Sequence, residues 1–139
     1  MKSDEIKGYW ILKSREDSPK QDVSFSIFDR VYTIEKSEVE IIAFNPNNNC
    51  YQLGINTVRE EEEVEDERIF DLVSFLPGKY NLTNSSIQIL DSGKMKIVDR
   101  ELHIIVAEPD YYCKEVWIRL PQEFDDLKRF IDKEIGHLD

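Results

Sequence analysis

Alternation of apolar and polar residues runs through most of the chain and predicts short β-strands. It is clearest in residues 23–27, 102–106 and 112–120, where apolar side chains recur at every second position, with Lys114 as the exception. A two-residue period places alternate side chains on opposite faces of a strand. A shorter apolar run at residues 8–13 predicts a first strand with both faces partly buried, followed by a polar loop at 16–21.

Turn-forming residues separate these segments at regular intervals. Residues 45–49 read Asn-Pro-Asn-Asn-Asn and join two apolar stretches, which predicts a hairpin. Further turns are expected at 91–93, 99–101 and 108–110. Short strands with turns every 8–12 residues are typical of a meander, a sandwich or a barrel.

The apolar residues in 69–76 fit both the period of a helix and the period of a strand. Ile69, Leu72, Val73 and Leu76 follow helical spacing, whereas Phe70, Leu72, Ser74 and Leu76 would form one face of a strand. The surrounding segments are predicted strands, so we favour a strand here, ending at Pro77-Gly78.

The pattern changes to a helical period over residues 121–135. Pro121 lies in the first turn, where its missing N–H is harmless, and acidic residues follow it near the positive end of the helix dipole. One face of the helix is apolar, and Gly136 is placed to end it. The sequence therefore predicts an amphipathic C-terminal helix that docks on the β-core.

The first strand carries Gly8-Tyr9-Trp10, and Arg119 lies late in the last strand. Together with the antiparallel strands and the C-terminal helix, these residues resemble the lipocalin-like (calycin) β-barrels. Residues 80–90 also resemble strands of small bacterial lipocalin-like domains. The resemblance implies that Trp10 closes one end of the barrel and that Arg119 lies across it. We expect one domain, residues 1–139, that is mainly β: an antiparallel meander closing into a lipocalin-like barrel.

The net charge of the chain restricts the kinds of molecule that it can bind. The 139 residues carry a net charge of -11, with a pI near 4.7. Nucleic-acid phosphates and anionic membrane surfaces would be repelled, whereas a basic protein would be attracted. Seven of eight positions between 60 and 67 are acidic, and these side chains must be solvated: Glu60, Glu61, Glu62, Glu63, Glu65, Asp66 and Glu67.

Motifs for catalysis, cofactors and metals are absent from the sequence. Cys50 and Cys113 lie in apolar stretches and are expected as buried thiols, with a single disulfide as the alternative. His103 should face solvent, and His137 follows the last helical turn. We expect a protein that is not an enzyme, without cofactor or metal. The first residues hold no signal-peptide core, which favours the cytoplasm; removal of a signal segment would place the protein outside it.

Two functions remain open. A barrel can hold a small apolar ligand, and the inward candidates to line it are Tyr9, Trp10, Phe25, Tyr51 and Trp117. Alternatively, the chain is an acidic protein-interaction module, such as an inhibitor or immunity-type protein that neutralises a basic partner. In that case the carboxylates at 60–67 would steer the association.

Overall fold

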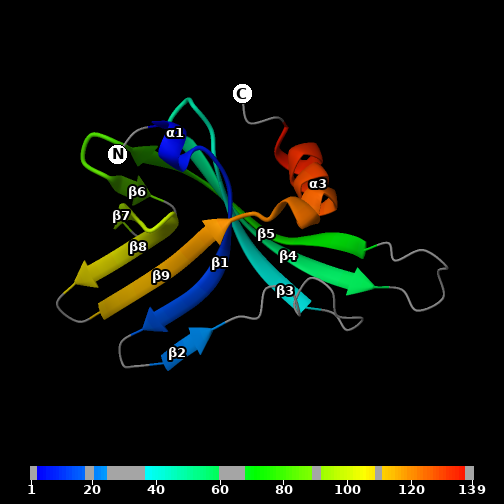
Figure 1. Cartoon of the computed structure of the whole chain (residues 1–139), viewed down its shortest axis with the longest axis horizontal. Coiled ribbons are helices and arrows are strands. Elements are labelled where there is room, and N and C mark those ends of the chain that lie inside the picture. The colour runs from blue at the N-terminus through cyan, green and yellow to red at the C-terminus, as the bar shows by residue number, and fades with distance from the viewer. Residues whose placement is uncertain are drawn as a thin grey trace.

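A computed structural model describes residues 3–17, 21–24, 37–59, 68–88, 92–108 and 111–136. The chain is mainly β, as the alternation predicts, and its elements run in the order shown in Figure 1. A short helix, α1 (Ser3–Ile6), precedes the sheet. A 3-10 turn, η1 (Gln122–Phe124), and a longer helix, α3 (Asp125–Ile135), follow it. The described strands are β1 (Gly8–Asp17), β2 (Gln21–Ser24), β3 (Ser37–Phe44), β4 (Asn49–Arg59), β5 (Arg68–Asn81), β6 (Ser86–Gln88), β7 (Ser92–Val98), β8 (Glu101–Glu108) and β9 (Tyr111–Arg119).

The strands form one antiparallel sheet that closes into an eight-stranded barrel. Neighbours along the sheet follow the order β2-β1-β3-β4-β5-β6-β7-β8-β9, and β1 also pairs with β9. That last pairing joins the two ends of the sheet, with β2 as an additional strand beside β1. The fold expected from the turn spacing is therefore confirmed.

The barrel is closed at one end and splayed at the other. β1 pairs with β3 only over residues 8–11, and beyond a bulge near Lys13 its other half pairs with β2. Similarly, β5 pairs with β6 only over residues 79–81. In Figure 1, β1, β2, β8 and β9 consequently diverge from β3, β4 and β5, and α3 lies on the side of the latter group.

Two apolar layers result from this arrangement. The barrel interior holds a buried cluster that includes Trp10, Leu12, Phe44, Leu102 and Trp117. The opposite face of β3 and β4 is buried too, because Phe124 of η1 and Leu127 and Ile131 of α3 cover it, and all three are 0% exposed. Helix α3 ends before Gly136, whose φ of 76° suits glycine, as expected from the sequence.

The segment with two possible periods, residues 68–76, is a strand. β5 then continues through Pro77 and Gly78, where the sequence suggested an end. At Pro77 the described strands provide a neighbour on the β4 side only, so a missing N–H is tolerated. Glu16 and Asp17 belong to β1 and not to the expected loop, because both pair with β9 and β2. The expected strand at 31–34 lies outside the described residues.

Candidate functional site

The closed end of the barrel is built around Trp10. Its ring is 1% exposed, and its Nε1–H donates to the Ile6 carbonyl at 2.7 Å. The Arg119 guanidinium lies 4.1 Å from the ring centroid, a cation–π geometry. Its two terminal nitrogens donate to the carbonyls of Lys7 (2.5 Å) and Glu5 (2.7 Å). Trp10 and Arg119 thus fix the segment that enters β1.

Gly8 makes this closure possible. Its φ is 113°, and a Cβ at this position would lie 3.0 Å from Nη1 of Arg119. A residue without a side chain is therefore needed both for the backbone conformation and for the approach of Arg119. This arrangement is compatible with a lipocalin-like barrel.

Side chains occupy the interior next to this closed end. Trp117 is fully buried beside Leu12 and Leu102, and Met95 and Ile104 are at most 6% exposed. Among the described residues these side chains form one contiguous cluster. Of the five ligand-lining candidates, Trp10 and Trp117 are in the interior and serve as its packing.

The prediction that Tyr9 and Tyr51 point into the barrel is wrong, because both lie on the outer face of the sheet. Both belong to the layer beneath α3, where the Tyr9 hydroxyl donates to Asp132 and the Tyr51 ring stacks on Phe75 at 5.7 Å. Both faces of β3 and β4 are buried, so apolar character did not distinguish inside from outside. Phe25 and the acidic residues 60–67 lie outside the described residues.

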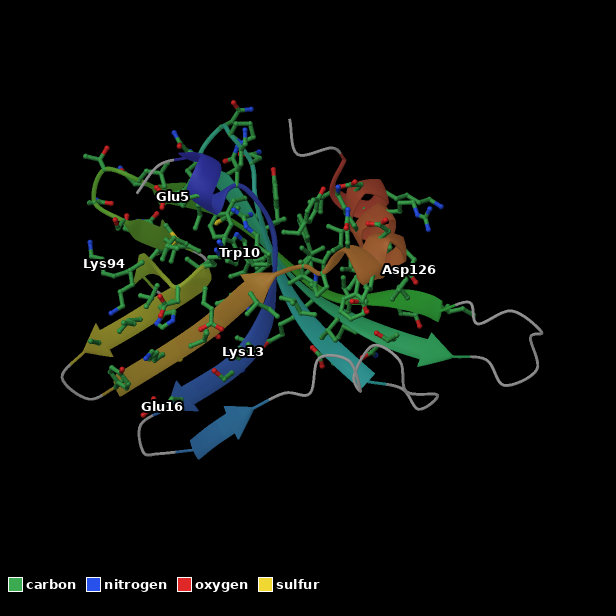
Figure 2. All side chains as sticks on the ribbon, in the orientation of Figure 1. Glu5, Trp10, Lys13, Glu16, Lys94 and Asp126 are labelled. Atoms are coloured by element: carbon green, nitrogen blue, oxygen red, sulfur yellow. The ribbon has the colours of Figure 1, made fainter. Side chains whose placement is uncertain are left out.

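Charged side chains line the open end of the barrel. Past the bulge, Arg15 faces the same side as Glu115, to which it donates from Nε (2.9 Å) and Nη2 (2.6 Å). Nη2 also donates to Glu40 on β3 at 2.9 Å, across the gap where β1 and β3 separate. Figure 2 shows the course of β1 from Trp10 to Glu16 toward this open end. A purely apolar ligand would meet partly buried charges here.

Glu115 gives this cluster a pH dependence. Burial raises the pKa of its carboxyl above the ordinary 4.5, and Arg15 opposes the shift only in part. The contribution of this group to the free energy of unfolding is therefore fully present below pH 4.5 and is lost as pH rises through the folded pKa.

Replacing Glu115 with Gln removes this titration. We expect the difference in the free energy of unfolding, wild type minus Glu115→Gln, to decrease as pH rises above 4.5. Urea unfolding of both proteins at a series of pH values measures this difference. A difference that stays constant or increases would contradict the assignment.

A second surface stands out on β5. Four of the five large hydrophobic side chains that are exposed among the described residues lie on this strand: Ile69 (39%), Leu72 (37%), Val73 (51%) and Phe75 (42%). We call these four residues the β5 apolar row. The sequence contained a signal for it, since residues 69–76 are apolar at both odd and even positions.

The histidine and cysteine side chains give weaker candidates for a functional site. His103 lies on the face of β8 away from Leu102 and Ile104, but both of its ring nitrogens are buried, so the expectation that it faces solvent is wrong. Burial together with Lys114 lowers its pKa. Cys50 and Cys113 are buried thiols that form no disulfide, as expected, and burial raises the pKa of Cys50 to about 12. The described residues contain no cluster of three or more His, Cys, Asp or Glu suited to a metal. No described helix is long and apolar enough to span a membrane.

A cleft of about 320 Å³ lies outside the barrel, between α3 and the junction of β1 with β9. Its lining includes Tyr9, Arg119, Asp125 and Lys128. Three of these side chains are already engaged: Arg119 contacts Trp10, and Lys128 lies above the Tyr9 ring. The cleft therefore belongs to the packing of the helix against the barrel end.

Comparisons with known proteins add no assignment. No protein-family description, no curated protein and no solved structure matches this chain.

Proposed function

We propose that this protein is a non-catalytic protein-interaction module that binds a basic partner through the β5 apolar row. The observation that carries the proposal is the exposure of four large apolar side chains on one strand. Apolar side chains grouped on a surface commonly mark an interaction site, whereas scattered ones do not. Among the described residues, the remaining large hydrophobic side chain that is exposed, Tyr112, lies on β9.

The alternative, a small apolar ligand inside the barrel, has less support. At the closed end the interior is occupied by Trp10, Trp117 and their neighbours. At the open end the lining contains Arg15, Glu40 and Glu115. An apolar ligand would have to displace packed side chains or lie against charges, and both cost free energy.

Charge favours a basic partner. The chain carries -11, and the acidic stretch 60–67 immediately precedes β5 in the sequence. Opposite charges accelerate encounter and are weakened by salt, whereas the apolar contact holds the complex once formed. The acidic stretch and the apolar row thus supply complementary contributions.

Substitution of Phe75 tests this proposal. We expect Phe75→Lys to lower affinity for the partner at least tenfold, about 1.4 kcal/mol, because it adds a positive charge that repels a basic partner and removes an aromatic contact. Partners would be recovered by cross-linking and identified. Affinity for the purified partner would then be measured at several salt concentrations.

Tyr112→Lys is the matched control. It makes the same charge change at a similarly exposed aromatic residue, 37% against 42%, on another strand. Support requires a basic partner whose affinity falls with salt and is lost in Phe75→Lys only. Equal effects of the two variants, or a partner that is acidic, would refute the proposal.

A further inference from the structure

The β5 strand has one paired edge and one open edge. It contains 14 residues and pairs with β4 from Arg68 to Lys79. On its other side, the described strands offer only the three-residue β6, which pairs with residues 79–81. Within the described part of the chain, residues 68–78 therefore have a partner strand on one side only. Backbone groups along such an edge are free to pair with another extended segment.

The open edge is also accessible. None of residues 69–79 is buried. The β5 apolar row projects from both faces of the strand, since Ile69 and Leu72 are three residues apart. The bulge at Val73 places Leu72 and Phe75 on the same face, opposite Ile55 and Leu53 of β4. A segment lying along this edge could cover apolar side chains above and below the sheet while its main chain pairs with β5.

Aromatic contacts with α3 and β4 hold β5 in place. Phe70 packs on Phe130 of α3 with ring centroids 5.6 Å apart, and Phe75 stacks on Tyr51 of β4 at an interplanar angle of 15°. A segment that binds here meets an edge already ordered by its neighbours, so little ordering cost falls on β5.

We propose that an extended, basic segment of a partner protein binds as an added strand along Ile69–Leu76. This inference rests on the proposed function and specifies its mode. Main-chain pairing would provide affinity, and alternate side chains of the segment would contact the β5 apolar row. Pro77 has no N–H to donate, so the added strand should end before it.

Charge distinguishes a basic segment from a second copy of this chain. Each copy carries -11, so two copies repel each other, whereas a basic segment is attracted. The bulge and Pro77 are also features that natural edge strands use against uncontrolled pairing. They restrict self-association without blocking a short added strand on residues 69–76.

The test uses a labelled peptide in which Lys alternates with Val and Thr, titrated into the full chain. We expect saturable binding that weakens with salt, and none by a peptide with Glu in place of Lys. Amide hydrogen exchange by NMR should slow at least tenfold on residues 69–76 when the peptide is bound. N-methylation of the peptide amides along one edge should reduce affinity at least tenfold, and Phe75→Lys should do the same.

The outcomes separate the mode from the function. Binding that Phe75→Lys abolishes, but that N-methylation leaves unchanged and that does not protect β5 amides, would overturn strand addition and leave the proposed function standing. Binding unaffected by Phe75→Lys and reduced by Tyr112→Lys would overturn both. Sedimentation showing that the free chain pairs with itself through residues 69–76, as judged by the same exchange measurement, would assign the edge to a second copy and overturn the inference.

Discussion

Replacing Trp10 with Ala is expected to lower the free energy of unfolding by about 3–5 kcal/mol. Trp10 is among the largest fully buried side chains, and its loss leaves a cavity among packed neighbours. It also leaves the Ile6 carbonyl without its indole donor and Arg119 without the ring beneath it. Urea unfolding followed by circular dichroism measures the loss.

Tyr112→Ala provides the comparison, since it removes an aromatic side chain that is 37% exposed and should change stability by less than about 1 kcal/mol. If Trp10→Ala were no more damaging than Tyr112→Ala, the role of Trp10 in closing the barrel would be wrong.

Leu127→Ala is expected to cost about 2–5 kcal/mol. Leu127 and Ile131 are one helical turn apart on the same face of α3, and both are 0% exposed against β3 and β4. The change removes part of the only described cover over this outer face. Amide exchange should show α3 loosening before the barrel strands unfold.

Lys128→Ala is the matched control on the next position of α3, where the side chain is exposed. It should change the free energy of unfolding by less than about 1 kcal/mol. Similar losses in the two variants, or α3 and barrel strands that exchange together in Leu127→Ala, would show that the helix is not a separately docked layer.

The C-terminal helix was predictable from the sequence because its determinants are local. The acidic first turn, the apolar face and Gly136 act within one segment, and the structure confirms them. Pro121 is extended and precedes the 3-10 turn η1, so its predicted place in the first helical turn is wrong. Strand segments from residue 95 onward were predicted well for a similar reason, since each alternates in isolation. The turn expected at 91–93 is wrong in part, because β7 already begins at Ser92.

Features that depend on pairing between distant segments were not predictable. The Arg15–Glu115 contact requires the bulge near Lys13, which changes the face on which the following residues lie. The outward position of Tyr9 and Tyr51 depends on α3 covering a second face of the sheet. The open edge of β5 depends on the shortness of β6, and alternation within β5 carries no information about its neighbours.

The pairing of β1 with β9 has a consequence for synthesis of the chain. These strands are separated by most of the sequence, so closing the barrel incurs the entropy of a long loop and should make folding slow relative to helical proteins of this size. During translation, β1 and β8 would each keep an unpaired edge until β9 has left the ribosome. A nascent chain stalled before residue 111 would therefore be the species most prone to aggregate and to need a chaperone.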